Sequence, residues 1–142
     1  MTRIESTFET LKAQNKKALI PYVMAGDPTP ANFVGLLHDL VKHGADMIEV
    51  GLPFSDPMAD GPTVASAGER ALAASTSTRD ALNMVAEFRK QDTQTPIILM
   101  GYLNPVEIIG YDNFVALCEQ SGVDGILMVD LHQPRRGFLP SI

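Results

Sequence analysis

Three acidic residues lie close together in the sequence, and two of them belong to a stretch rich in proline and glycine. Glu49 is part of a short apolar run, and Asp56 and Asp60 follow it within residues 51–62. Burying a carboxylate in an apolar run is costly unless a partner or a function compensates for it. Paired carboxylates can act as general acid and general base in one reaction. Glu49 is therefore a candidate acid–base residue, although an acid at a strand end can also simply accept a hydrogen bond from a backbone N–H group.

The segment 51–62 also has the composition of a fixed loop. Its three prolines reduce the freedom of the unfolded chain, and its two glycines permit tight backbone turns. The pairs Asp56-Pro57 and Asp60-Gly61 also occur in ordinary turns, so plain turn structure is the alternative interpretation of these two acids.

The composition limits the classes of protein and of function that remain. The chain has 142 residues and a net charge of -6, from 17 acidic and 11 basic residues. This length suits one domain at most, and the acidic balance argues against nucleic-acid binding. A single cysteine excludes a disulfide framework and fits the reducing cytoplasm. No apolar run approaches the ~18 residues of a membrane span, and the charged N-terminal segment lacks the apolar core of a signal peptide.

Four apolar runs must supply the strands that position these acids. Continuous apolar runs, rather than alternating ones, are typical of parallel strands buried on both faces. They cover residues 18–24, 47–50, 97–101 and 125–129. Apolar residues at helical spacing precede each run, in four stripes: Ile4, Phe8 and Leu11; Phe33, Leu36, Leu37, Leu40 and Val41; Ala81, Met84, Val85 and Phe88; Phe114, Leu117 and Cys118.

The resulting order is helix, strand, helix, strand, helix, helix, strand, helix, strand. It predicts right-handed βαβ units in an α/β fold with a parallel sheet. Two junctions, Gly44-Ala45-Asp46 and Gly122-Val123-Asp124, share a pattern that indicates a helix end, a turn and a strand start. In such folds functional residues collect in the loops after the strands. Those loops hold residues 25–28, 49–62, 101–105 and Asp130.

Several other chemistries find no support in the sequence. A Schiff-base aldolase needs a lysine in the site, and none of the five lysines follows a predicted strand. His38 and His43 lie five residues apart on one predicted helix and project in different directions, so solvated positions are preferred over metal ligands. Cys118 lies on an apolar helix stripe, which favours a packing role. No glycine-rich nucleotide-binding motif is present, and we predict no metal site.

The string from Glu49 to Pro62, EVGLPFSDPMADGP, resembles the signature of the tryptophan synthase alpha chain family at every fixed position. The resemblance implies a (β/α)8 TIM barrel, of which residues 1–131 would form the N-terminal half, with four parallel strands, flanking helices and an N-terminal helix. One departure is Ser75, where the family often has glycine; a shifted helix end would accommodate it. Shorter matches are Pro21-Tyr22, Ala25-Gly26-Asp27-Pro28, Met100-Gly101-Tyr102-Leu103-Asn104-Pro105 and Gly122-Val123-Asp124-Gly125.

The resemblance implies a lyase of tryptophan biosynthesis. The family splits indole-3-glycerol phosphate into indole and glyceraldehyde 3-phosphate by retro-aldol cleavage. By resemblance, Glu49 is the acid–base residue that moves protons at the ring carbon and the hydroxyl, and Asp60 faces the indole nitrogen. The residues that resemble those shaping the indole pocket are Tyr22, Met100, Tyr102 and Leu127.

The resemblance also implies a partner protein. Asp56 and the pair Asn104-Pro105 resemble surfaces that face a tryptophan synthase beta chain in an alpha2-beta2 tetramer, with ordinary turn structure as the alternative. The chain itself would need no cofactor, because pyridoxal phosphate belongs to the beta chain. We expect a cytoplasmic protein that binds neither nucleic acid nor membrane. The alternative function is that of a catalytically inactive fragment that at most binds a beta chain.

Residues 132–142 depart from the family pattern. The family continues after Asp130-Leu131 with Pro-Pro-x-Glu-Glu, whereas residues 132–136 here read His-Gln-Pro-Arg-Arg. Deleting one base from codons for Leu-Pro-Pro-Ala-Glu-Glu yields Leu-His-Gln-Pro-Arg, so the hypothesis is a frameshifted, non-family tail, and the alternative is a naturally divergent C-terminus. A complete barrel takes ~250 residues and binds phosphate after its last two strands, so we expect the phosphate site to lie outside this chain.

Overall fold

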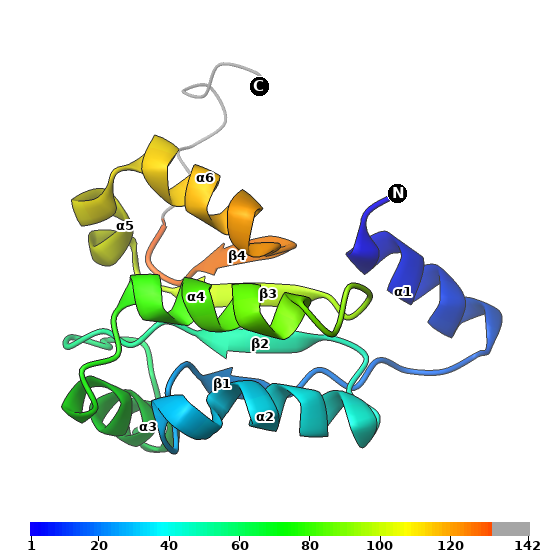
Figure 1. Ribbon diagram of the computed structural model, residues 1–142, viewed down its shortest axis with the longest axis horizontal. Coiled ribbons are helices and arrows are strands. Elements are labelled where there is room, and N and C mark those ends of the chain that lie inside the picture. Colours follow the sequence, from blue (N-terminus) through cyan, green and yellow to red (C-terminus); the bar gives the residue numbers. More distant parts are fainter. Residues whose placement is uncertain (132–142) are drawn as a thin grey trace.

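The structure, a computed structural model, describes residues 1–131 as six helices and four strands (Figure 1). Residues 132–142, on which the predicted non-family tail falls, lie outside the described residues, so the boundary at residue 131 stays a prediction. Within the described part, none of the helices has the length and apolar character needed to cross a membrane. The elements are α1 (Arg3–Ala13), β1 (Tyr22–Met24), α2 (Pro30–Lys42), β2 (Ile48–Gly51), α3 (Pro62–Ala73), α4 (Thr78–Arg89), β3 (Ile97–Gly101), α5 (Leu103–Ile109), α6 (Tyr111–Ser121) and β4 (Gly125–Met128).

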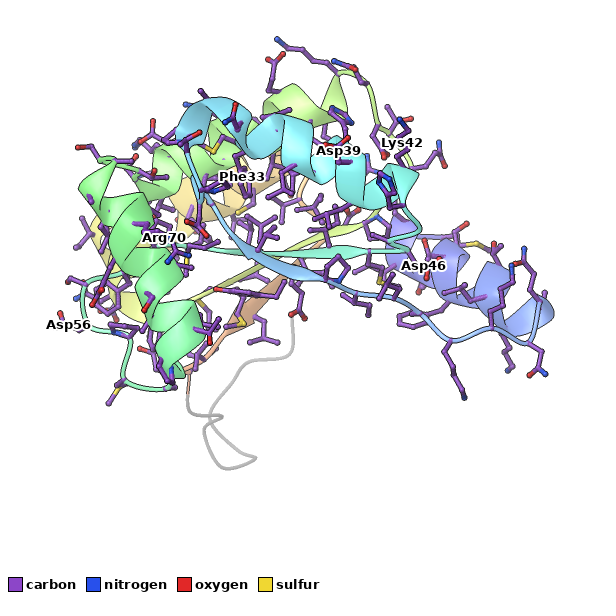
Figure 2. The ribbon with its side chains drawn as sticks, turned by 90° about the horizontal axis from the view of Figure 1, so that it is seen from below. Phe33, Asp39, Lys42, Asp46, Asp56 and Arg70 are labelled. Atoms are coloured by element: carbon purple, nitrogen blue, oxygen red, sulfur yellow. The ribbon has the colours of Figure 1, made fainter. Side chains whose placement is uncertain are left out.

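The four strands form one parallel sheet in the order β1-β2-β3-β4, so each strand pairs with the next one in the sequence. Helices α2 and α4 lie on one side of this sheet (Figure 2). Helix α1 lies at the opposite end of the strands from α3 and α5 (Figure 1). The predicted α/β class, with four successive parallel strands, flanking helices and an N-terminal helix, is confirmed.

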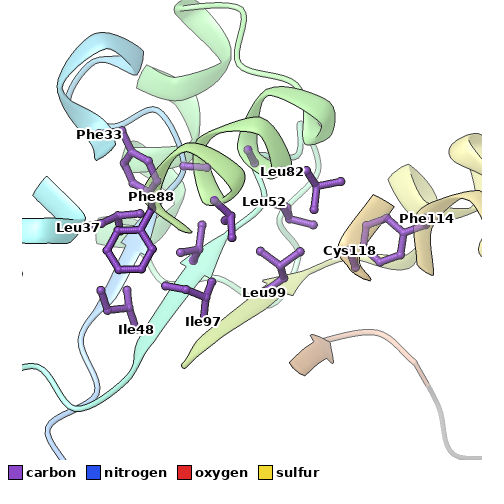
Figure 3. Close-up of a cluster of buried hydrophobic side chains, with 14 of the residues drawn as sticks. Phe33, Leu37, Ile48, Leu52, Leu82, Phe88, Ile97, Leu99, Phe114 and Cys118 are labelled. Atoms are coloured by element: carbon purple, nitrogen blue, oxygen red, sulfur yellow. The ribbon is translucent and has the colours of Figure 1, made fainter. Parts of the chain in front are cut away.

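The helix-covered face of the sheet carries the hydrophobic core (Figure 3). Side chains alternate between the two faces of a strand, and every second residue of β2 and β3 points into this core. Those strand residues are fully buried: Ile48, Val50, Ile97 and Leu99. Residues at helical spacing pack against them: Phe33 and Leu37 of α2, Leu82, Val85 and Phe88 of α4, and Phe114 and Cys118 of α6. Burial of Cys118 confirms its predicted packing role.

The aspartates of the two Gly-x-Asp junctions each bond to the backbone of the neighbouring segment. Asp46 precedes β2 and contacts the segment before β1, and Asp124 precedes β4 and contacts β3. Asp46 accepts a hydrogen bond from the Leu19 backbone N–H at 2.8 Å and donates its own N–H to the Leu19 carbonyl at 2.9 Å. Asp124 makes the same pair of bonds with Ile97, at 2.8 and 2.9 Å. The shared sequence pattern therefore fixes the start of two strand pairs by the same contacts.

Asp124 also forms ion pairs with two arginines, Arg89 and Arg3, at this end of the sheet. Its Oδ2 lies 2.7 Å from Arg89 Nη2, and its Oδ1 lies 2.8 Å from Arg3 Nη1 of helix α1. The carboxylate side chain is only 6% exposed and that of Arg89 only 10%. Arg89 further donates to the carbonyls of Gly122 and Thr95, at 2.9 and 2.7 Å. A buried pair of this kind is costly to break by removing one member, because the other charge stays buried.

The start of the first strand and the segment after the third strand differ from the prediction. The first predicted strand begins at residue 18, but regular pairing begins only at Tyr22. Pro21 has no N–H to donate, and the Leu19 N–H bonds to the side chain of Asp46 instead of to a strand. The structure also has helix α5 where the sequence predicts a loop carrying Asn104 and Pro105. Proline is tolerated early in a helix, where the backbone N–H groups lack partners within the helix.

Ser75 has a φ of 60°, in the left-handed region that favours glycine. It follows the C-terminal residue of α3, Ala73, and the capping residue Ala74. A glycine at this position would adopt the same backbone conformation without a steric cost, so the serine introduces local strain.

We predict that Asp124→Ala lowers the free energy of unfolding by about 3–5 kcal/mol, because it leaves Arg89 buried without its partner. The measurement is urea denaturation followed by circular dichroism. Asp112→Ala, which changes an exposed acid in the first turn of α6, is the matched control and should change stability by less than about 0.5 kcal/mol. Equal effects of the two variants would contradict the structural role of Asp124.

We predict that Ser75→Gly raises the free energy of unfolding by about 0.5 kcal/mol, because relief of the left-handed strain exceeds the added entropy of the unfolded chain. Ser66→Gly, in the exposed interior of α3, serves as the control and should lower stability by about 0.5 kcal/mol. Thermal melts of both variants test the sign. A Ser75→Gly variant less stable than the wild type would contradict the inference that the backbone at Ser75 is strained.

Candidate functional site

The strand register places four of the predicted site residues on the same face of the sheet. Tyr22 pairs with Glu49, Gly51 pairs with Met100, and Met100 pairs with Leu127. Because side chains alternate along a strand, these residues lie opposite the core residues of β2 and β3. Within residues 1–131, helix α3 packs beside Met24 at the β1 edge of this second face, and the middle of the face carries no helix (Figure 2). Leu127 is accordingly 46% exposed, while Tyr22, Glu49 and Met100 are half-buried.

Gly51 is required where it stands because the Tyr22 ring lies over it. A Cβ atom at Gly51 would lie 2.0 Å from the Tyr22 hydroxyl oxygen and 2.7 Å from the ring carbon that carries it. Burial raises the pKa of Tyr22 to about 12, and the nearby charges of Asp60 and Glu49 act in the same direction. Tyr22 therefore presents a neutral hydroxyl group near the two candidate catalytic carboxylates.

Glu49 lies within β2, and its side chain is on the same face as that of Tyr22. Its backbone N–H donates to the carbonyl of Pro21 at 2.9 Å, which holds the strand in place. Within the described residues, its carboxylate makes no hydrogen bond or ion pair. The alternative interpretation of Glu49, a strand-end acid satisfied by a backbone N–H group, therefore has no support, and the carboxylate is available for a ligand.

Asp60 reaches the same end of the sheet through a contact with Tyr102. The Tyr102 hydroxyl donates to Asp60 Oδ1 at 3.0 Å and accepts from the Ala59 backbone N–H at 2.9 Å. The ring of Phe54 packs against that of Tyr102 with centroids 5.4 Å apart. Burial raises the pKa of Tyr102, and the hydrogen bond to Asp60 also favours the protonated phenol. Two of the predicted site residues, the acid Asp60 and the pocket residue Tyr102, are thus in direct contact.

The residues predicted to face a partner protein lie at the same end of the strands. Asp56 is exposed in the loop after β2, far from Asp39 and Asp46 (Figure 2). Asn104 is exposed in the first turn of α5, and Pro105 is half-buried beside it. The Tyr102–Ala59 hydrogen bond joins the two segments, so a partner could contact both at once.

Sequence reasoning missed two contacts that hold these loops. Asp130 accepts a hydrogen bond from the Leu103 backbone N–H at 2.8 Å and so stabilises the start of α5. Its position two residues after β4 was a signal, because acids at strand ends often satisfy neighbouring backbone donors. Arg70 of α3 forms a two-pronged ion pair with Asp27, at 2.7 and 3.0 Å (Arg70 is labelled in Figure 2). Nothing in the spacing of Asp27 and Arg70 indicated that pair.

The histidines occupy different environments, and one prediction about them is wrong. His43 is exposed, with Nδ1 2.7 Å from the Asp39 carbonyl oxygen. His38 is not solvated as predicted: its ring packs on Phe88 with centroids 4.7 Å apart, and its Nε2 is buried without a partner. The reason is that α2 packs against α4 at this turn. Across residues 1–131, no group of three or more His, Cys, Asp or Glu side chains is arranged to hold a metal ion.

Comparison with known proteins gives one consistent result. A family model described as the tryptophan synthase alpha chain matches residues 8–139. The tryptophan synthase alpha chain of Psychrobacter arcticus is 91% identical over 137 residues, which cover 96% of this chain and 49% of that relative. The alpha chain of Psychrobacter cryohalolentis is 90% identical over 137 residues, covering 96% of this chain and 50% of the relative. The chain therefore spans about half the length of the curated relatives it matches.

A solved structure agrees with the fold described above. The crystal structure of tryptophan synthase subunit alpha from Legionella pneumophila str. Paris matches with a TM-score of 0.90 and 58% identity, covering 92% of this chain and 50% of that chain. The arrangement of β1 to β4 and their helices is thus that of half of a tryptophan synthase alpha barrel. By sequence and by fold, this chain belongs to the tryptophan synthase alpha chain family.

Proposed function

We propose that this chain carries the acid–base residues for cleavage of indole-3-glycerol phosphate to indole and glyceraldehyde 3-phosphate, a step of tryptophan biosynthesis. The observation that carries the proposal is the convergence of two carboxylates, Glu49 and Asp60, at the end of one uncovered sheet face beside Tyr22. Two carboxylates with separate surroundings can take opposite roles in proton transfer. The 91% identity to the Psychrobacter arcticus tryptophan synthase alpha chain, over 96% of this chain and 49% of that relative, supports a role in tryptophan biosynthesis.

The proposed reaction moves protons without a net gain or loss. Glu49, in its acid form, protonates the indole carbon that carries the glycerol chain, while the ring nitrogen releases its proton toward Asp60. The Glu49 carboxylate then accepts the proton of the hydroxyl beside the breaking bond, and the bond electrons return to the ring as the aldehyde forms. Reprotonation of the nitrogen completes the indole. A base placed within hydrogen-bond reach contributes about 10²–10⁴-fold to the rate of such a step.

The pocket for the indole ring is proposed to consist of the apolar groups that share the face with Glu49. Met100 and Leu127 are paired neighbours on the adjacent strands β3 and β4. The rings of Tyr22 and Tyr102 lie near the carboxylates. Aromatic and apolar walls with a few polar groups are typical of sites for flat organic ligands. The proposed role of Tyr22 and Tyr102 is therefore to hold the ring plane against the sheet.

The proposed partner is a tryptophan synthase beta chain, which would carry the pyridoxal phosphate. Asp56 and Asn104 are both exposed and lie on segments joined by the Tyr102–Ala59 hydrogen bond, and this geometry supports a single binding surface. We place the proposed assembly in the cytoplasm, in keeping with a single, unpaired cysteine.

A second candidate function is binding of the beta chain without turnover. The exposed Leu127 favours it, because water reaches the sheet face within residues 1–131 and weakens electrostatic stabilisation of a transition state. Stimulation of a beta chain by this polypeptide, with no indole release from indole-3-glycerol phosphate, would select this second function.

We predict that Glu49→Gln reduces indole release from indole-3-glycerol phosphate by about a hundredfold or more, because the amide can neither donate nor accept the transferred proton. The purified chain and its variant are compared in a discontinuous assay of indole. Glu69→Gln, which changes an exposed glutamate of α3, is the control and should retain the wild-type rate. Undiminished turnover in Glu49→Gln would show that another group performs the chemistry.

We predict that Asp56→Ala and Asn104→Ala each weaken binding to a tryptophan synthase beta chain by about fivefold, the equivalent of one exposed polar contact. Isothermal titration calorimetry gives the dissociation constants. Asp39→Ala, an equally exposed acid on α2, should bind like the wild type. If all three variants bind alike, the proposed surface is wrong.

A further inference from the structure

The Tyr102 hydroxyl is shared between two groups of one loop. It accepts the Ala59 N–H at 2.9 Å and donates to Asp60 Oδ1 at 3.0 Å. The Tyr102 side chain is held in this orientation, because the residue is only 4% exposed and its ring packs on Phe54 at 5.4 Å. A hydroxyl with one donor bond and one acceptor bond has its proton position determined as well.

The backbone that carries Tyr102 is itself fixed by neighbouring loops. Tyr102 is the residue before α5, and the next N–H, that of Leu103, donates to Asp130 at the end of β4 at 2.8 Å. On the other side, the Leu52 N–H donates to the carbonyl of Met100 at 2.8 Å. Tyr102 therefore links the loops that follow β2, β3 and β4.

Asp60 lies in a loop whose backbone forms two short-range hydrogen bonds, from the Met58 N–H to the Asp56 carbonyl and from the Asp60 N–H to the Pro57 carbonyl, but most of its side chains face solvent. Residues 55, 56, 58 and 59 are exposed, and Asp60 itself is half-buried. An aspartate side chain in such a loop populates several rotamers, and fixing one of them has an entropic cost at the moment a ligand binds. The bond from Tyr102 occupies Oδ1, and within the described residues no protein donor reaches Oδ2. That second oxygen is free to accept a hydrogen bond from a ligand N–H group.

We propose that Tyr102 is a positioning residue, whose hydroxyl fixes loop 52–61 and aims the free oxygen of Asp60 at the indole N–H group; this inference rests on the function proposed above. The phenol acts through Asp60 and Ala59, and its ring keeps the separate role of a pocket wall. Pre-organising the acceptor before the ligand arrives removes the ordering cost from the binding step.

Paired probes separate this role from simple packing. Indole carries the N–H group, and 1-methylindole lacks it but has nearly the same shape. Dissociation constants of both probes are measured by NMR titration for the wild type, for Tyr102→Phe and for Tyr111→Phe. Tyr111 is the matched control, because its exposed hydroxyl donates to Glu107 Oε1 at 3.1 Å, a tyrosine–carboxylate bond outside the site.

The wild type and Tyr111→Phe should bind indole about fivefold more tightly than 1-methylindole, as expected for one hydrogen bond to a carboxylate in a partly wet site. Tyr102→Phe should reduce this ratio to about one while changing the affinity for 1-methylindole by less than about twofold. A Tyr102→Phe variant that keeps the fivefold preference, or that weakens both probes equally, would overturn the positioning role.

Hydrogen exchange of the Ala59 amide tests, without any ligand, whether the Tyr102 hydroxyl holds the loop through its hydrogen bond to Ala59. Exchange should be about tenfold faster in Tyr102→Phe than in the wild type, because the amide loses its acceptor, and unchanged in Tyr111→Phe. Equal exchange in all three proteins would overturn the inference. If the wild type fails to bind indole, the proposed function fails, and the Ala59 exchange rate still decides whether the Tyr102 hydroxyl holds the loop.

Discussion

Pairing of β1 with β2 in a single register is the constraint on which the candidate site depends. Tyr22 stands opposite Glu49, and two residues further along Met24 stands opposite Gly51. A slip by one residue would turn Glu49 into the core and bring Val50 to the uncovered face, because side chains alternate along a strand. Gly51 reinforces the register, since only a residue without a Cβ atom fits beneath the Tyr22 hydroxyl. One glycine thereby couples the alignment of two strands to the position of a site residue.

The two ends of the sheet use acidic residues in different ways. At the start of the strands, Asp46 and Asp124 accept backbone and guanidinium donors, and their contacts hold neighbouring segments together. At the far end, Asp130 stabilises the start of α5, whereas Glu49, within β2, keeps a carboxylate without a partner among the described residues. Parallel α/β folds commonly divide stability and chemistry between their two ends in this manner. Glu49, the acid without a hydrogen-bond partner among the described residues, is thus the one proposed to transfer protons.

Much of the architecture could be predicted from the sequence because its signals are local. Continuous apolar runs and the helical spacing of residues such as Phe33 and Phe88 indicate which face is buried. The start of β1 could not be predicted from apolar character, because the absent N–H of Pro21 and the side chain of Asp46 decide it. Helix α5 was missed because its proline and its shortness both resemble a loop.

The candidate site could be predicted residue by residue only through the resemblance of residues 49–62 to a family signature. Its internal contacts could not, because they join distant parts of the chain. The bond between Tyr102 and Asp60 spans 42 positions, and the burial of His38 depends on the packing of α2 against α4. No local pattern encodes such pairings. The departure at Ser75 was visible in the sequence, but only the backbone conformation shows its cost.

We propose that the uncovered face of the sheet and the loop carrying Asp60 form one binding site for an indole ring. The most direct measurement is an NMR titration of the isotope-labelled chain with indole. We expect the amide signals of the proposed site residues to shift together with one dissociation constant: Tyr22, Glu49, Asp60, Met100 and Leu127. Shifts confined to another apolar surface, such as the groove around Phe8 and Leu11 beside α1, would contradict it.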